Sequence, residues 1–342
     1  MKPSSRHLAL LALAGLVMAA SLPLSAGPLR DRIKERMQQR GESGDLEDMS
    51  GGEALSCAEW SRKLERLQRF AGNRQNGPTP ERKDIAYGAA ARETLDVYLP
   101  KARDEAAPII LMAHGGGWCV GDKAARGVAK NKVERWTARG FVFVSVNYPM
   151  VDNGADALAQ AHHVAEAAAY VQAHAREWGG DPKRLILMGH SAGAHLVSLV
   201  GADSRIRQAK GVGPLLGTVS LDSGAMDVVT QMPRVYSFLK LRYREAFGET
   251  KAEWVTASPF HRLDATSPPW LGVCSTTRKD DPCDQARAFA DKARSLGTRA
   301  EVLPQAKNHG AINSDLGLEN DYTRRVEAFM VSLDPVVAER LR

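Results

Sequence analysis

The chain has 342 residues, of which 44% are hydrophobic and 25% are charged, and its formal net charge is +6. This composition is that of a globular protein with one large domain or two small ones, and it excludes a disordered or fibrous chain. The basic residues are scattered and do not alternate with aromatic residues. No nucleic-acid partner is therefore indicated.

Residues 1–26 have the pattern of a secretory signal peptide. Lys2 and Arg6 precede an apolar run over 8–20, and small residues follow as far as Ala26. The apolar run is shorter than the roughly 18 residues that a membrane span requires. We expect cleavage after Ala26 and an exported mature protein, periplasmic or extracellular, without a stable membrane span. A lone membrane anchor is the alternative.

The next segment, 27–79, is predicted to be a linker and an N-terminal helical extension. Residues 27–56 are charged and rich in Gly and Ser, which favours a flexible or weakly helical linker. A helix is predicted over 57–70, because apolar residues recur there on one helical face: Trp60, Leu64, Leu67 and Phe70. The sequence GNRQNGPTP then ends it.

Four cysteines are present, and export permits them to form disulfides. Three complete pairings are possible. We favour Cys274 with Cys283, nine residues apart across a strand end and its loop, which leaves Cys57 with Cys119. Buried free thiols are the alternative. No Cys-x-x-Cys or histidine-rich spacing occurs, so no metal site is expected.

From residue 84 onward, strand and helix patterns alternate. Strands are predicted over 94–100, 108–118, 141–149, 184–189, 217–227, 268–276 and 299–304, and helices over 124–140, 155–178, 192–202, 283–297 and 320–334. The strands are largely apolar throughout, which is typical of a parallel sheet covered on both faces.

This alternation predicts an α/β catalytic domain over 80–342. We expect a three-layer α/β/α sandwich with a mostly parallel, doubly wound sheet. Residues 226–268 interrupt the rhythm and are predicted to form a partly helical, lid-like insertion. In such open sheets the ligand lies beyond the carboxyl ends of the strands, so the loops there are expected to carry the chemistry.

The first such loop is Gly189-His190-Ser191-Ala192-Gly193, between a buried strand and a helix. It matches the G-x-S-x-G turn, in which small residues let strand and helix approach closely and the serine projects from the sheet edge. Ser191 is therefore a candidate nucleophile. A structural glycine-rich turn is the alternative.

The second loop is HGGGW, residues 114–118, directly after a predicted strand. Consecutive glycines allow backbone N–H groups to point into a site and stabilise a tetrahedral oxyanion. Gly116 and Gly117, with Ala192, are the expected donors. His114 precedes the serine and is expected to pack and hydrogen-bond within the loop. Neither phosphate-binding glycine pattern is present.

The third loop is AKNHGAIN, residues 306–313, after the last predicted strand. A serine hydroxyl needs a general base near neutral pH, and histidine suits that role. His309 is the expected base because it follows the final strand and precedes a glycine. The other histidines lie on predicted helices, in the insertion, beside the serine turn, in the glycine loop or in the signal peptide.

An acidic side chain must orient this imidazole, and the expected order is Ser, acid, His. The loop after strand 268–276 offers Asp280 and Asp281, and we favour Asp280 because it is closer to the strand end. Asp281 is the alternative. Asp222 and Asp227, after the preceding strand, are further candidates, because triads sometimes draw the acid from there.

Several segments occur in a recognisable order: AYG…LDVYLP, HGGGW, VNYP, WGGDPKRLILMGHSAGAHLV, ASPFHRL…SPPWL and NHG. Together, over about 80–335, they resemble the α/β-hydrolase fold, specifically the esterase/lipase group with an HGGG oxyanion loop. This group includes hormone-sensitive-lipase-like carboxylesterases and the related feruloyl-esterase and kynurenine-formamidase-like enzymes. The resemblance implies a serine hydrolase without metal or cofactor.

Carried over residue by residue, the resemblance makes Ser191 the nucleophile and His309 the base, with an oxyanion hole formed by Gly116, Gly117 and Ala192. Members usually place the acid seven residues before the glutamine that opens the next helix. Here Arg278 stands seven residues before Gln285. The acidic pair follows two and three residues later, which suggests a reshaped loop.

The expected activity is hydrolysis of carboxylic esters of small to medium substrates through an acyl-enzyme. The alternatives are an arylformamidase or amidase, which would use the same residues, and an inactive binding homologue. The expected partner is a small-molecule ester.

Overall fold

The structure is a computed structural model that describes residues 54–71, 77–101 and 106–342. The predicted signal peptide and most of the predicted linker lie outside the described residues. The helix predicted over 57–70 is present as α2 (Cys57–Ala71).

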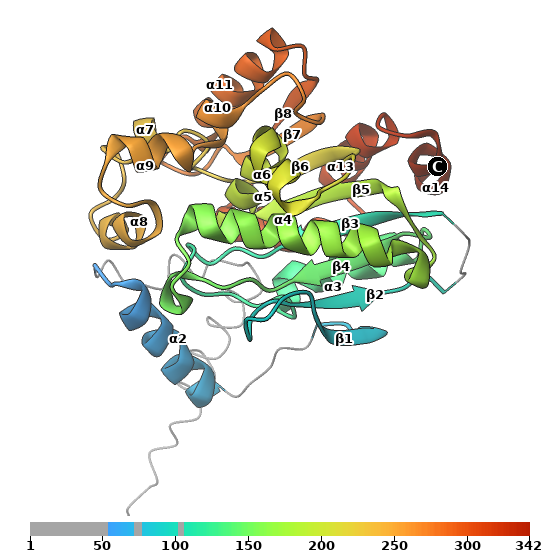
Figure 1. Cartoon of the computed structure of the whole chain (residues 1–342), viewed down its shortest axis with the longest axis horizontal. Helices are drawn as coiled ribbons and strands as arrows, with labels where there is room; N and C mark the ends of the chain where they lie inside the picture. The colour runs from blue at the N-terminus through green and yellow to red at the C-terminus, as the bar shows by residue number, and fades with distance from the viewer. Residues whose placement is uncertain (1–53, 72–76, 102–105) are drawn as a thin grey trace, which may run out of the picture.

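Eight strands form one sheet in the order β1-β2-β4-β3-β5-β6-β7-β8 (Figure 1). Their bounds are Arg82–Ala86, Thr94–Tyr98, Ala107–Ala113, Val142–Val146, Gly180–His190, Gly217–Leu221, Trp270–Ser275 and Ala300–Gln305 for β1 to β8. β2 pairs antiparallel with β1 and β4, and all other pairs are parallel. The predicted mostly parallel, doubly wound sheet is confirmed.

Helices cover both faces of this sheet. One face carries α3 (Arg126–Thr137), α12 (His309–Ser314), α13 (Asp321–Val331) and α14 (Pro335–Leu341), and the other carries α4 (Ala157–His174), α5 (Ala192–Ala202), α6 (Ser204–Lys210) and α11 (Pro282–Ser295). Because side chains alternate along a strand, Ile109 and Leu111 of β3 enter one core and Ile110 and Met112 enter the other. The strands are apolar at successive positions because each face of the sheet packs against its own hydrophobic core.

The segment between β6 and β7 forms four short helices. They are α7 (Val228–Gln231), α8 (Lys240–Phe247), α9 (Lys251–Thr256) and α10 (Pro259–Arg262). Trp118 of the glycine loop packs edge-to-face against Tyr243 and Phe247 of α8, with ring centroids 5.1 and 4.6 Å apart. This places α8 over the glycine loop.

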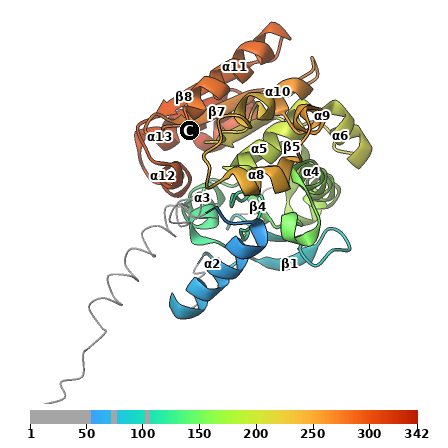
Figure 2. The same ribbon diagram turned by 90° about the vertical axis from the view of Figure 1, so that its left-hand side faces the viewer.

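Two disulfides are present, Cys57–Cys119 and Cys274–Cys283, which confirms the favoured pairing. The first fixes α2 to the residue after the glycine loop. The Cys57 backbone N–H also donates to Glu245 Oε2 of α8 at 2.7 Å, and Trp60 is fully buried. Figure 2 shows α2 and α8 side by side. The helical extension is thus attached at the carboxyl edge of the sheet.

The sequence pattern does not predict strand β1, because its residues are mostly exposed and lack an apolar pattern. Its partner β2 is buried and agrees with the predicted strand. Among the described residues, none of the helices combines the length and the apolar character that a membrane crossing requires.

We predict that Lys132 makes stability depend on pH. Its Nζ is buried under α12 and donates to the backbone oxygens of Asn313, at 2.5 Å, and Gly127, at 3.0 Å. Burial lowers the pKa of Lys132 to about 7, although Asp315 opposes this. Between about pH 7 and the ordinary lysine value, the unfolded chain therefore binds more protons than the folded one. In this window Lys132 adds up to about 1.4 kcal/mol per pH unit to the free energy of unfolding as pH rises.

Urea unfolding at pH 7.5 and 9.5 measures this slope. Lys132→Met removes the titrating group, so the variant is expected to lack the increase in the free energy of unfolding between pH 7.5 and pH 9.5. Lys251→Met, on exposed α9, is the control and is expected to retain the wild-type difference between the two pH values. Equal slopes for wild type and Lys132→Met would contradict the prediction.

Candidate active site

Ser191 occupies a strained turn between β5 and α5. Its backbone has φ 55° and ψ −119°, and a positive φ is costly for a residue with a side chain. The flanking glycines make this turn possible: a Cβ on Gly189 would overlap the Gly193 backbone, and one on Gly193 would overlap the carbonyl oxygen of Ala113. The sequence pattern thus produces a sharp strand-to-helix turn with the serine at its tip.

The glycine loop lies directly against this turn. A Cβ on Gly115 would be 2.9 Å from the Cβ of Ser191, and a Cβ on Gly116, where φ is +127°, would overlap the carbonyl oxygen of Val120. Gly117 also has a positive φ of 60° and lines the same pocket as Ser191. The structure therefore brings Gly116, Gly117 and the turn that contains Ala192 together.

His309 begins α12, after β8, and its imidazole is bound by the carboxylate of Asp222. His309 Nδ1 is 2.6 Å from Asp222 Oδ2. The His190 ring, from the residue before Ser191, lies 4.4 Å from the His309 ring, and His190 Nε2 is 3.0 Å from the backbone oxygen of His309. The imidazole is thus held at the serine turn.

Asp222 is the first residue after β6, and the structure corrects the sequence prediction at this point. The carboxylate of the predicted acid, Asp280, accepts hydrogen bonds from Arg278 (Nε to Oδ1 at 2.9 Å, and Nη2 to Oδ2), whereas Asp222 is the carboxylate at 2.6 Å from His309 Nδ1. The alternative, Asp281, is exposed at the N-terminus of α11. β6 and β7 are parallel neighbours that end at one edge, so either loop can reach His309.

The Asp222 carboxylate is completely buried and remains ionised because of its partners. Burial alone would raise its pKa, but the Arg278 cation and the hydrogen bond with His309 outweigh it and hold the pKa well below its usual range. Its Oδ1 also accepts the backbone N–H of Ser275 at 2.7 Å. A permanently charged carboxylate in this position favours a protonated imidazole at His309.

The three buried histidines around the site are held neutral. Burial, followed by the Arg92 charge, lowers the pKa of His114 to about 4, and burial lowers the pKa of His195 to about 4. Burial and the neighbouring His309 lower the pKa of His190 well below its usual value. His114 stacks on Tyr148, whose hydroxyl donates to the His114 backbone oxygen at 2.6 Å. His114 thus packs within the loop, as expected.

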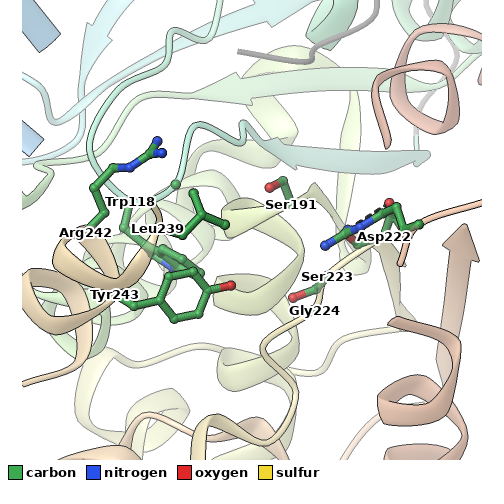
Figure 3. A pocket seen from close by; sticks show the side chains of 10 residues that line it. Trp118, Ser191, Asp222, Ser223, Gly224, Leu239, Arg242 and Tyr243 are labelled. Atoms are coloured by element: carbon green, nitrogen blue, oxygen red, sulfur yellow. Dashed lines mark hydrogen bonds and ion pairs between the residues drawn. The ribbon is translucent and has the colours of Figure 1, made fainter. Parts of the chain in front are cut away.

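A pocket of about 390 Å³, including its mouth, opens beside Ser191 (Figure 3). It is lined by Gly117, Trp118, Ser191, Asp222, Ser223, Gly224, Leu239, Arg242, Tyr243 and Arg278. In Figure 3, Ser191 lies between the Asp222 side and the side chains of Leu239, Arg242 and Tyr243. The insertion therefore supplies one wall of the pocket.

One group among the described residues has the donors for a metal ion: Glu93, His163 and Glu166, whose ligand atoms lie within 4.8 Å of one another. Its members already bind protein partners, His163 Nδ1 to Glu93 at 2.7 Å and Lys210 Nζ to Glu166 at 2.8 Å. None of the three lines the pocket beside Ser191.

The fold and the strained serine turn define an α/β-hydrolase, and its relatives place it in the esterase/lipase group. The model of the BD-FAE family matches residues 95–292, more than half of the chain. The chain belongs to this family.

Named relatives point the same way. The chain is 27% identical over 278 residues to a probable isoprenylcysteine alpha-carbonyl methylesterase, ICMEL1, of Arabidopsis thaliana, covering 75% of this chain and 56% of that protein. It is 27% identical over 259 residues to esterase LipC of Mycobacterium tuberculosis, covering 67% and 59%. The chain thus spans little more than half the length of these relatives.

A solved structure shows the same fold. Esterase 2 of Thermogutta terrifontis, in a form phosphonylated by sarin, superposes with a TM-score of 0.62 at 20% sequence identity. The match covers 75% of this chain and 96% of that one.

Proposed function

We propose that the protein hydrolyses carboxylic esters of small to medium size through an acyl-enzyme. The observation that carries the proposal is the His309–Asp222 pair beside Ser191, which stands on a strained turn in the pocket that Gly117 also lines. The relatives named as esterases support it. The pocket beside Ser191 is lined in part by the apolar side chains of Trp118, Leu239 and Tyr243, which suit the acyl or alcohol group of an ester.

In the proposed reaction, Ser191 Oγ attacks the ester carbonyl carbon while His309 Nε2 takes the hydroxyl proton. The carbonyl oxygen becomes an oxyanion, which accepts hydrogen bonds from the backbone N–H groups of Gly116, Gly117 and Ala192. Asp222 holds the imidazole by Nδ1 and stabilises the imidazolium that forms.

Collapse of this intermediate breaks the bond to the leaving alcohol, which takes the proton from His309. The acyl group remains on Ser191. Water then attacks the acyl carbon with His309 again as base, and the acid is released as Ser191 regains its proton.

We also propose that the mature protein is exported. The support is the N-terminal sequence pattern and the two disulfides, which persist in oxidising compartments.

A fluorophosphonate probe tests the proposed nucleophile. We expect one adduct per chain, located at Ser191 by peptide mass spectrometry, with loss of p-nitrophenyl acetate hydrolysis in proportion to labelling. A parallel assay with N-formylkynurenine compares ester with aryl formamide as substrate. Labelling of another residue would refute the proposed nucleophile, and faster turnover of the formamide would make the protein an amidase that uses the same residues.

A further inference from the structure

The loop after β7 carries Arg278 at the position where the family resemblance expects an acid. This arginine contacts Asp222, the carboxylate that binds His309 instead. We propose that Arg278, paired with Asp280, is a positioning residue that holds Asp222 and moderates the charge at His309. The inference rests on the proposed function, because it assumes that His309 is the base.

Arg278 fixes both the backbone and the carboxylate of Asp222. Its Nη1 donates to Asp222 Oδ2 at 3.0 Å and to the Asp222 backbone oxygen at 3.1 Å. Asp222 has a positive φ of 58°, a conformation that L-residues rarely adopt and that surrounding contacts must hold. The guanidinium therefore stabilises a strained residue at the point where its side chain must meet His309.

Asp280 fixes the other edge of the guanidinium. Arg278 donates through Nε and Nη2 to the two oxygens of this carboxylate, which is the planar two-point pairing that arginine forms with carboxylates. The side chains of Arg278 and Asp280 are 20% and 16% exposed, so solvent screens the pair only in part. Gly224 lies over the pair: a Cβ there would be 3.2 Å from both Arg278 Nη2 and Asp280 Oδ2.

The guanidinium also lies close to the imidazole. Arg278 Nη1 is 3.0 Å from His309 Nδ1. Because Nδ1 is also 2.6 Å from Asp222, its proton points to the carboxylate, and the arginine acts on the ring through its charge. Asp222 favours the imidazolium, Arg278 disfavours it, and Asp280 partly neutralises Arg278.

Other ionisable groups on several elements interact with the residues that surround the imidazole. The His190 ring of β5 contacts the His309 ring, and Lys132 of α3 acts on His190 by its charge. Asp222 acts by its charge on Tyr322 of α13, and Asp315, which Lys307 binds, acts on both Tyr322 and Lys132. Arg278 and Asp222 both lie within 3.0 Å of His309 Nδ1 itself. The balance between these two charges is therefore expected to set the pH at which His309 becomes a base.

The test is the pH dependence of kcat/KM for p-nitrophenyl acetate. Arg278→Gln removes the positive charge and the hydrogen bonds that Arg278 donates to Asp222. We expect kcat/KM to fall about 10²-fold through misplacement of the base. The acid limb of the profile should move about one unit to higher pH, because the imidazolium loses an opposing charge. Arg278→Lys retains the charge and should keep the acid limb near its wild-type position.

Asp280→Asn gives the opposite signature. It leaves the Arg278 charge less neutralised, so the acid limb should move to lower pH, with a loss of several-fold in kcat/KM. Arg287→Gln, an exposed arginine of α11 that pairs with Asp284, is the matched control and should change neither quantity.

Circular dichroism and fluorophosphonate stoichiometry establish folding of each variant. If Arg278→Gln does not fold, the direction of the Asp280→Asn shift decides. A wild-type acid limb in a folded Arg278→Gln, or a shift of both variants in the same direction, would overturn the inference while leaving the esterase proposal intact. Failure of Ser191 labelling would instead refute the proposed function.

Discussion

Replacement of Ser191 by alanine is expected to reduce kcat for p-nitrophenyl acetate by about 10⁶-fold, as loss of the nucleophile does in serine proteases. The variant loses the only atom that we propose to form the covalent intermediate. The structure around it should persist, because alanine is smaller and the turn is set by the glycines at 189 and 193. Steady-state rates above the buffer background, with probe labelling, measure the effect.

The matched control is Ser223→Ala. Ser223 lines the same pocket and its hydroxyl accepts the backbone N–H of Ala225 at 3.2 Å, yet it is not on the strained turn (Figure 3). We expect this variant to stay within several-fold of wild type and to be labelled normally. Full activity of Ser191→Ala, or an equal loss in both variants, would refute the proposed role of Ser191.

The sheet and the serine turn are predictable because local patterns determine them. Central strands such as β3 and β4 are buried on both faces, so every residue in them is apolar or small, and the pattern is distinct even in one sequence. The turn requires glycine at 189 and 193 for steric reasons, and the spacing of those glycines is visible in the amino-acid sequence alone. Local steric requirements are therefore enough to predict the position of the serine turn in the fold.

The carboxylate that contacts His309 is not predictable in the same way, because it depends on contact between two loops. Asp222 and Asp280 follow neighbouring parallel strands, and both lie at the carboxyl edge of the sheet. Arg278, which is 56 residues from Asp222 in the sequence, binds both carboxylates, and Asp222 is the one that lies 2.6 Å from His309 Nδ1. The available signal is that Asp222 directly follows the last residue of a buried strand, whereas Asp280 lies five residues beyond its strand.

Replacement of Asp222 by asparagine is expected to lower kcat about 10⁴-fold, as the equivalent change does in a serine protease. The amide has nearly the same shape, so the pocket should be unchanged. It lacks the charge that stabilises the imidazolium, and its NH₂ group can hold His309 in the tautomer that cannot accept the serine proton. Burial raises the pKa of Asp222, but Arg278 and His309 lower it by more, so the pKa lies well below its usual range. The carboxylate is therefore ionised throughout the neutral range in the wild type. The variant loses this charge, which favours the imidazolium, so the acid limb of its pH profile should also move to lower pH.

Asp280→Asn and Asp281→Asn are the matched comparisons, since each removes one carboxylate from the loop that the sequence favours. Asp281 is exposed, so its variant should retain wild-type kcat. Asp280 binds Arg278, which in turn contacts His309, so its variant should lose several-fold and no more. A loss of kcat in Asp280→Asn as large as that in Asp222→Asn would contradict the role of Asp222 and favour Asp280 as the acid. The double variant separates the two cases: if Asp280 acts only by positioning Asp222, adding Asp280→Asn to Asp222→Asn should cost little more, because the carboxylate that it positions is already absent.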